Sequence, residues 1–165
     1  MNKITNINKL LEIGRSRRSY DIYKFIGDGW IILFEDTVKI TKIIDTLVSF
    51  KEIFLINYYK YIEPLLEIDI GYIGITAGID IGELFVIELG TQIEYVGRAL
   101  NIASRLQNVI STGEGDPSNK ILISNKCFSL IEGYKLKDSF RYEDKKRKLK
   151  NIVDDQEFRC KMIYI

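Results

Sequence analysis

The chain has 165 residues, of which 46% are hydrophobic and 28% charged, enough to bury the core of one domain and too polar for a membrane-embedded protein. Its 24 basic and 23 acidic residues nearly cancel, so the net charge predicts no general attraction to nucleic acid or to a membrane surface. The chain contains no histidine, which excludes Ser-His and Cys-His catalysis and the usual zinc sites. Any chemistry must therefore use carboxylates, lysine, arginine, backbone groups and bound metal.

Targeting and redox signals are weak. Met1 is followed by polar residues rather than an apolar signal region, which predicts a cytoplasmic protein. The longest apolar runs, such as 30–34, have the length of a strand and are too short to span a bilayer. Cys127 and Cys160 form no disulfide framework or metal-binding pattern, so we expect two buried free thiols.

The first part of the chain predicts a helix followed by a hairpin. Residues 5–18 place apolar residues on one helical face. Residues 19–26 are typical of a strand, Gly27-Asp28-Gly29 of a tight turn, and 30–35 of the return strand. Because the return strand is apolar on both faces, we expect it to be central in its sheet.

A second helix is expected after the hairpin, capped by Asp36 or Thr37, continuing to about residue 61 and ended by Pro64. Residues 68–80 predict a long strand, whose glycines indicate close approach by another backbone or a ligand. The remaining elements are expected as a strand at 84–89, a helix at 97–109, a loop at 111–120, a strand at 121–124, a helix at 125–131, and strands at 134–142 and 157–165. This order favours a single α+β domain, residues 1–165, with helices on one face of an antiparallel sheet.

Two segments carry candidate chemistry. Gly27-Asp28-Gly29 can serve only as a hairpin turn, or it can present Asp28 as a hard oxygen ligand for Mg²⁺ or Mn²⁺. Asn101 and Arg105, four residues apart, project from one helix face. They form either an ordinary exposed polar face or a phosphate-handling pair, with Arg105 stabilising phosphoryl charge and Asn101 orienting the sugar or its attacking hydroxyl.

Read together, these segments resemble the catalytic domain of the class III nucleotide cyclases, the adenylate and guanylate cyclase family. Lys24 stands three residues before Gly27-Asp28, and Glu94 stands three residues before Gly97, as in the family's motifs. Asn101 to Arg105 occupies the family's Asn-x-Ala-x-Arg helix. The resemblance runs from about Ser19 to Gln107 and is weaker near residues 149–152, where Lys150 or Lys148 is a candidate triphosphate contact.

The resemblance implies a ferredoxin-like, palm-type antiparallel sheet with helices packed on it. It implies that a ribonucleoside triphosphate is cyclised when its 3′-hydroxyl attacks the α-phosphate and pyrophosphate leaves. In the family, two Mg²⁺ or Mn²⁺ ions, bound by one protomer, polarise the nucleophile and the leaving group, while the partner supplies Asn and Arg. A homodimer with active sites at its interface is therefore implied, without nucleic acid or membrane as a partner.

Lys24 and Glu94 would select the base. A lysine and an acid can pair with adenine or cytosine, and with the roles exchanged they can pair with uracil, so the pair leaves the base open. Glu94 is one methylene longer than the family's usual aspartate, which favours a pyrimidine. The strings around Asp28 and Asn101 also resemble the compact cyclases of the Pycsar anti-phage systems, which make cyclic UMP or cyclic CMP for a separate effector. An adenylate cyclase making cAMP is the alternative.

One part of the family pattern has no counterpart. The family's first strand supplies another metal aspartate roughly 40 residues before the Gly-Asp turn, whereas only 27 residues precede Asp28 here. Asp21 is too near Asp28 to replace that aspartate. The chain is therefore either a form without its first strand and one metal ligand, or a degenerate homologue. A non-catalytic cyclase-like module that binds nucleotide or dimerises is the rival interpretation, and a palm-like polymerase relative would need a second carboxylate beside Asp28.

Overall fold

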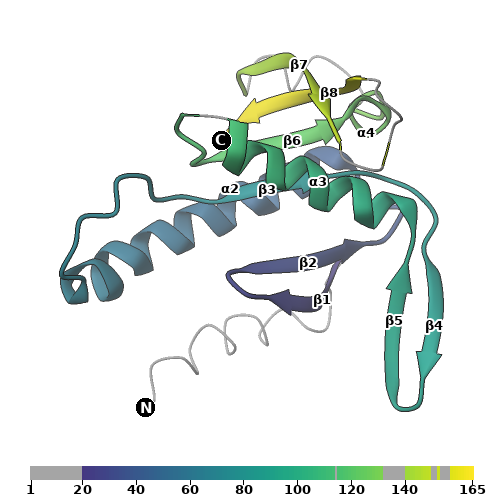
Figure 1. Cartoon of the computed structure of the whole chain (residues 1–165), viewed down its shortest axis with the longest axis horizontal. Coiled ribbons are helices and arrows are strands. Elements are labelled where there is room, and N and C mark those ends of the chain that lie inside the picture. The colour runs from purple at the N-terminus through teal and green to yellow at the C-terminus, as the bar shows by residue number, and fades with distance from the viewer. Residues whose placement is uncertain (1–19, 114, 132–139, 150–151, 153–156) are drawn as a thin grey trace. The chain divides into compact units, whose positions relative to one another are not determined.

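The computed structural model describes residues 20–113, 115–131, 140–149, 152 and 157–165 (Figure 1). The chain divides into two compact units, residues 1–39 and 40–165, and each is described by itself. The predicted helix over 5–18 lies outside the described residues. Among the helices that are described, none combines the length and the apolar character that a membrane crossing requires.

The first unit contains the predicted hairpin. Strand β1, Tyr20–Ile26, pairs antiparallel with β2, Gly29–Phe34, and Gly27 at the turn has a φ of 61°. The expectation that the return strand is central was wrong for the described residues, where β2 pairs with β1 alone and Trp30 is 57% exposed. The apolar side chains instead stack across the hairpin, with the Phe25 and Trp30 ring centroids 5.5 Å apart.

The second unit begins with the long predicted helix. Helix α2, Ile40–Asn57, continues into the π-helical turn η2, Tyr58–Ile62, and the 3-10 turn η3, Glu63–Leu65, after which the backbone becomes extended at Leu66. The predicted end at Pro64 is thus confirmed. The helix starts later than Asp36 or Thr37 because the intervening residues form a turn, in which the Val38 amide donates to the Glu35 carbonyl at 3.0 Å. Its buried stripe consists of Ile40, Ile43, Ile44 and Leu47.

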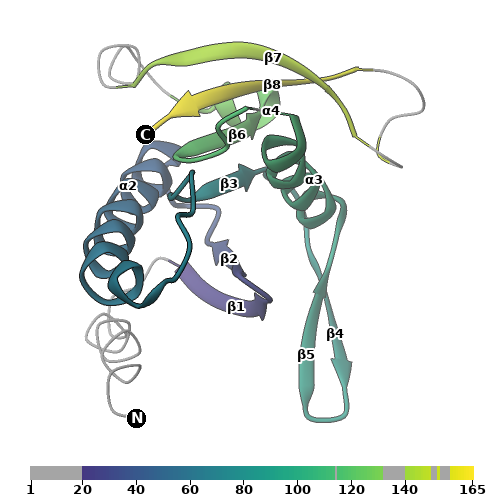
Figure 2. The same ribbon diagram turned by 60° about the vertical axis from the view of Figure 1, so that its left-hand side comes forward.

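A four-stranded sheet forms the centre of the second unit, in the order β3-β6-β8-β7. The strands are β3, Thr76–Ile79; β6, Lys120–Ser124; β7, Tyr142–Lys148; and β8, Glu157–Tyr164. Helix α3, Arg98–Gly113, packs against β3 and β6, as Figure 2 shows. The fold is therefore α+β as predicted, but β3 and β6 are parallel, so this sheet is mixed rather than antiparallel. The reason is the connection through α3, because a crossover helix returns the chain in the same direction.

Two strand predictions were wrong in their extent. Of the predicted strand over 68–80, only Thr76–Ile79 is a strand. The strand predicted over 134–142 instead starts at Tyr142 and includes most of the lysine- and arginine-rich stretch 145–150, while residues 132–139 lie outside the described part. Ion pairs across β7 and β8, such as Lys146 Nζ to Glu157 Oε2 at 3.3 Å, accompany these lysines in the strand. Such cross-strand pairing involves residues distant in sequence, so local patterns did not show it.

The core of the second unit lies between α3 and this sheet. One face of α3 contributes Ile102, Leu106 and Ile110, which pack with Leu122, Cys160 and Met162 from the strands. Leu106, Leu122 and Met162 are fully buried. Short helix α4, Asn125–Phe128, follows β6 directly, and the Ser124 hydroxyl caps it by accepting from the Cys127 amide at 3.2 Å.

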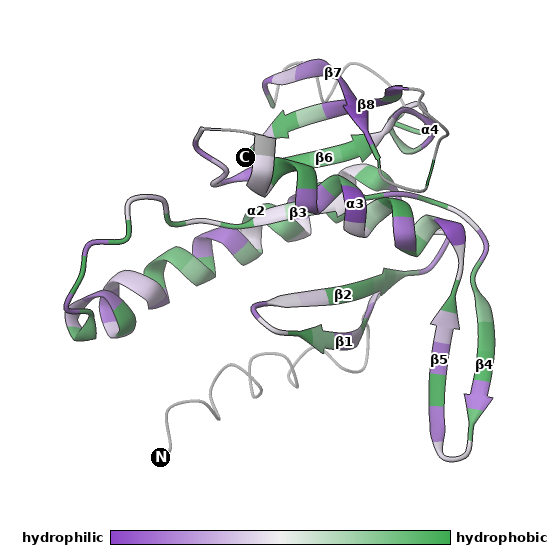
Figure 3. Cartoon of the chain, in the orientation of Figure 1, coloured by the Kyte–Doolittle hydropathy of each residue, from purple (hydrophilic) through white to green (hydrophobic). Residues whose placement is uncertain are grey.

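A two-stranded hairpin precedes α3 and projects from the sheet in both views (Figures 1 and 2). It consists of β4, Phe85–Leu89, and β5, Gln92–Val96, paired antiparallel around a turn at Gly90, whose φ is 64°. The first strand was predicted at 84–89, but the second was not. Every residue of β4 is exposed, and the strand is largely apolar (Figure 3).

Candidate functional site

Helix α3 carries two of the sequence-predicted site residues, and the sheet fixes its position closely. A Cβ placed on Gly78 of β3 would overlap the Ala103 carbonyl, so only glycine lets the helix approach this strand. Beside this contact, the Gln107 side-chain amide donates to the Thr76 hydroxyl at 3.0 Å. The glycine-rich strand was predicted to allow close backbone approach, and at Gly78 that prediction is confirmed.

The start of α3 is fixed by a second glycine. The Asn101 amide donates to the Gly97 carbonyl at 3.4 Å, the first helical hydrogen bond. A Cβ on Gly97 would lie 2.6 Å from the Glu83 carbonyl oxygen and 2.7 Å from Leu84 Cδ2. The chain entering β4 therefore passes directly against the chain that leaves β5, and no larger residue fits between them.

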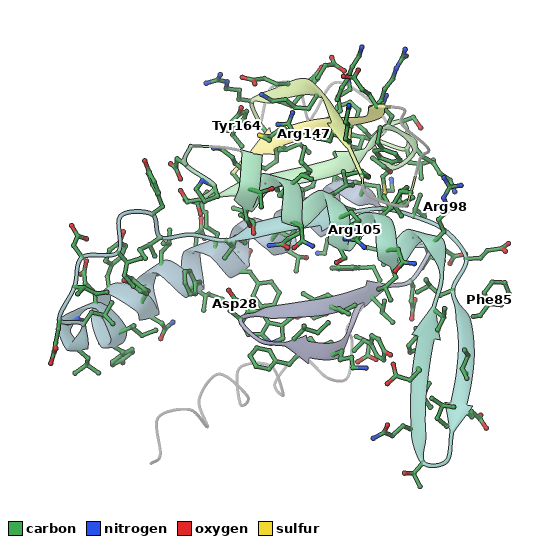
Figure 4. All side chains as sticks on the ribbon, in the orientation of Figure 1. Asp28, Phe85, Arg98, Arg105, Arg147 and Tyr164 are labelled. Atoms are coloured by element: carbon green, nitrogen blue, oxygen red, sulfur yellow. The ribbon has the colours of Figure 1, made fainter. Side chains whose placement is uncertain are left out.

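Asn101 and Arg105 share the side of α3 away from its core. Asn101 is exposed and Arg105 half-buried, whereas Ile102 and Leu106 beside them are buried. Figure 4 shows Arg105 on the middle of the helix, outside the layer between α3 and the sheet. The structure therefore places both side chains on one helix face, as the spacing predicted. A guanidinium and an amide presented in this way can bind a phosphoryl oxygen and a hydroxyl.

Glu94 lies on β5, opposite Ile87 of β4, and is half-buried. Only Tyr95 and Val96 separate it from Gly97, the residue before α3. The acid and the Asn-Arg helix are therefore joined by a short extended segment, within the same unit. Sequence analysis had not predicted β5, although the alternation of Ile93 with Glu94 after a Gly-Thr pair was a hairpin signal.

Asp28 and Lys24 belong to the first unit. Asp28 is exposed in the two-residue turn between β1 and β2, and Lys24 is an exposed residue of β1. The Lys24 ammonium lies 5.7 Å from the centroid of the Tyr23 ring. Asp21 pairs with Leu33 at the opposite end of the hairpin from Asp28, which confirms that it stands on a strand. The two carboxylates therefore do not share the turn.

The residues present can be compared with what a divalent metal requires. Within the described ranges, no three or more Cys, Asp or Glu side chains gather into a metal-binding group. Mg²⁺, however, is often held by only one or two carboxylates together with substrate phosphates and water. Asp28, an exposed carboxylate on a fixed turn, fits a metal that arrives with a triphosphate and does not fit a cage built from protein alone.

The other candidates are less informative. Lys148 is exposed at the end of β7, next to the buried Leu149, and Lys150 lies outside the described residues. The two cysteines are buried free thiols, as predicted. Burial raises the pKa of Cys127 to about 12 and that of Cys160 to about 11, so neither thiol is a nucleophile near neutral pH. Sequence reasoning missed Gln107, whose role depends on a contact with a distant strand.

Comparison with known proteins adds no family assignment. No protein-family model matches the chain, and a search of curated proteins found no significant match. Function is therefore inferred from the sequence motifs and from how the fold presents them.

Proposed function

We propose that this chain is a class III nucleotide cyclase domain, which converts a ribonucleoside triphosphate to a 3′,5′-cyclic nucleotide and pyrophosphate. UTP or CTP is the favoured substrate. The observation that supports this most is helix α3, whose Asn101 and Arg105 face outward while Gly78 and Gly97 fix the helix against the sheet and the β4–β5 hairpin. With the exposed Asp28 turn, these residues would supply a cation, an amide and one metal ligand for the reaction.

In the proposed reaction the 3′-oxygen forms a bond to the α-phosphorus, and the bond between that phosphorus and the bridging oxygen to the β-phosphate breaks. The proton of the 3′-hydroxyl passes to solvent water as the oxygen attacks, and pyrophosphate is the leaving group. Arg105 stabilises the negative charge that develops on the phosphoryl oxygens, and Asn101 orients the ribose. Divalent metal bound at Asp28 would supply the charge that activates the hydroxyl and stabilises pyrophosphate. Removing one such group typically slows the reaction by about two to three orders of magnitude.

Lys24 and Glu94 are the proposed base-reading pair. Their ammonium donor and carboxylate acceptor match the hydrogen-bonding edges of cytosine and adenine, and uracil with the roles exchanged. The longer side chain of Glu94 reduces the room for a purine, which is why a pyrimidine is favoured over adenine. Cyclic UMP or cyclic CMP would then be a second messenger for a separate effector in anti-phage defence.

We propose that the domain has the palm-type fold of this family and acts as a homodimer. The exposed apolar residues of the β4–β5 hairpin support dimerisation, because they include Phe85, Val86, Ile87, Leu89, Ile93 and Val96. A two-stranded hairpin is marginally stable alone, and exposed apolar strands are typical of association surfaces. Since the hairpin leads into α3, a partner bound there would lie next to the helix that carries Asn101.

A non-catalytic module that binds nucleotide is the second candidate. One observation favours it, because no second carboxylate accompanies Asp28 in the described turn. Such a protein would bind a nucleoside triphosphate without turnover. Calorimetry with UTP, CTP and ATP would show binding by the wild type, weakened by Arg105→Ala, while no cyclic product formed.

The direct experiment is an assay of the purified chain with each of the four NTPs and Mn²⁺, with products separated by chromatography. A cyclic pyrimidine nucleotide is expected, and cAMP would instead identify an adenylate cyclase. Arg105→Ala and Asp28→Ala should each abolish the product without unfolding the protein, whereas Ser104→Ala, on the exposed side of the same helix, should retain it. No product from any NTP would contradict catalysis by this chain.

A further inference from the structure

A crevice of about 370 Å³ lies in the second unit, beside the beginning of α3. It is bounded by the connection after β3, residues 80–83, by the first turn of α3 and by the junction of β6 with α4. Its volume is within the range of sites that hold small ligands, about 300–1,000 Å³. Neither Asn101 nor Arg105 lines it, so it is separate from the site proposed above.

Three cationic side chains from different elements line the crevice: Arg98 of α3, Lys126 of α4 and Arg159 of β8. All three are exposed. Arg98 donates to the Ile152 carbonyl at 3.5 Å, and Lys126 donates to the Ile81 carbonyl at 3.1 Å. These bonds orient the side chains but neutralise no charge. Throughout the part of the chain that the structure describes, none of the three forms an ion pair.

The other lining residues limit what kind of anion would fit. Asp80 accepts a hydrogen bond from the buried Ser124 hydroxyl at 2.5 Å, and Glu83 is exposed. These carboxylates can accept bonds from hydroxyl groups, while Ile102 and Phe158 provide apolar surface. Inorganic phosphate alone would fill only the cationic part of the crevice and leave these carboxylates without hydroxyl donors. A molecule with one anionic end and several hydroxyls would satisfy both sets of groups.

The walls are also held in place before any ligand binds. A Cβ on Gly82 would lie 3.1 Å from the Ala99 Cβ, so the 80–83 connection packs closely on α3. The Ser124 hydroxyl donates to Asp80, which ties the end of β6 to the connection after β3, and it accepts from the Cys127 amide, which ties β6 to α4. Preorganised walls reduce the entropic cost of binding.

We propose that this crevice binds a small sugar phosphate, with its phosphate on Arg98, Lys126 and Arg159 and its hydroxyls on Asp80 and Glu83. The assignment rests on the shape of the crevice, on three cations from separate elements that form no ion pair with a described residue, and on two nearby carboxylate acceptors. Binding needs no metal, because arginine and lysine supply the charge. The site goes beyond the proposed cyclase function and does not depend on it.

Isothermal titration calorimetry with ribose 5-phosphate in the presence of EDTA tests the proposal. EDTA removes the divalent metal that the proposed triphosphate site requires, so this measurement is independent of cyclase activity. The wild type should bind ribose 5-phosphate, and Arg98→Gln and Arg159→Gln should each weaken binding about tenfold, as expected for a lost charged hydrogen bond. Lys42→Gln, on the exposed side of α2, is the matched control and should bind like the wild type.

Two further titrations test whether the sugar hydroxyls contribute to binding and whether the ligand binds in this crevice. Inorganic phosphate should bind more weakly than ribose 5-phosphate if the hydroxyl contacts are real, and equal binding would overturn the assignment to a sugar phosphate. Arg105→Ala should leave the binding of ribose 5-phosphate unchanged. If this variant lost binding, the ligand would lie on the proposed catalytic face and the proposal for the crevice would be overturned. Undetectable binding by the folded wild type at millimolar concentration would overturn the proposal outright.

Discussion

The β4–β5 hairpin and the four-stranded sheet are both rich in apolar strand residues, yet they differ completely in burial. Ile121, Leu122 and Ile123 of β6 are fully buried, whereas Phe85 of β4 is 69% exposed. Figure 4 shows Phe85 pointing away from the hairpin. Strand β6 lies between β3 and β8 and has α3 packed against it, whereas β4 pairs only with β5 in the described structure. Apolar sequence therefore builds the core in one region and leaves an exposed apolar surface in the other.

The largest contrast should come from the core. Leu106→Ala should destabilise the protein by about 2–5 kcal/mol, because Leu106 is fully buried and the surrounding residues can collapse only partly around the space left. The free energy of unfolding from urea titration measures this. Ser104→Ala, on the exposed side of the same helix, should change it by no more than about 0.5 kcal/mol. Equal effects from both variants would show that α3 does not pack as described.

Close packing of α3 on β3 predicts a somewhat smaller effect. Gly78→Ala should cost about 1–3 kcal/mol, because the added methyl group overlaps the Ala103 carbonyl and the helix must shift. Gly71→Ala is the comparison, since nothing lies within 4 Å of a Cβ there and its φ is not positive. Urea titration of the two variants should therefore separate them clearly. A tolerated Gly78→Ala with full stability would contradict the contact between helix and strand.

Substitutions in the β4–β5 hairpin should change the oligomeric state of the protein rather than the stability of the protomer. If the chain is the homodimer proposed above, Phe85→Ser combined with Leu89→Ser should shift the molecular mass in light scattering from dimer to monomer, because both side chains lie on the exposed strand β4. Leu65→Ser is the control, because Leu65 is 81% exposed but belongs to η3 and not to the β4–β5 hairpin. If the Leu65 variant became monomeric and the hairpin variant stayed dimeric, the association surface would be assigned to the wrong region.

The smallest effect concerns a surface network on the sheet. Hydrogen bonds from Lys145, Arg141 and Tyr164 lower the pKa of Glu143 to about 2, from an ordinary value of 4.5. A lowered folded-state pKa stabilises the protein above pH 4.5, and this contribution is lost as the pH falls from 4.5 toward 2. The urea midpoint of the wild type should therefore fall more steeply over that window than that of Glu143→Gln. Parallel pH profiles would show that the network contributes nothing.

Local periodicity predicted the elements whose neighbours are close in sequence. The hairpin over Asp28, helices α2 and α3, and strand β8 follow from turn residues and from spacings of 2 or 3.6. The extents of β3 and β7 could not be predicted, because β3 is limited by its register with β6 and β7 by its register with β8. Those registers join residues far apart in the chain.

In the candidate site, too, local sequence predicted some features, while others depend on residues far apart in the chain. The shared face of Asn101 and Arg105 follows from helical spacing alone. The contacts that hold this helix do not, because Gly97 is constrained by Glu83 and Gln107 by Thr76, across intervening elements. The relation of Asp28 to Arg105 depends on a second copy of the chain under the proposal, which no pattern within one sequence can specify.

Mixing two inactive variants tests the proposed shared site most directly. Asp28→Asn and Arg105→Ala should each lack cyclase activity with Mn²⁺ and the preferred NTP. If each site combines Asp28 of one protomer with Arg105 of the other, refolding an equal mixture should restore about a quarter of wild-type activity, since half the dimers are mixed and each has one intact site. A mixture as inactive as the separate variants, with an active wild type, would contradict the proposed site.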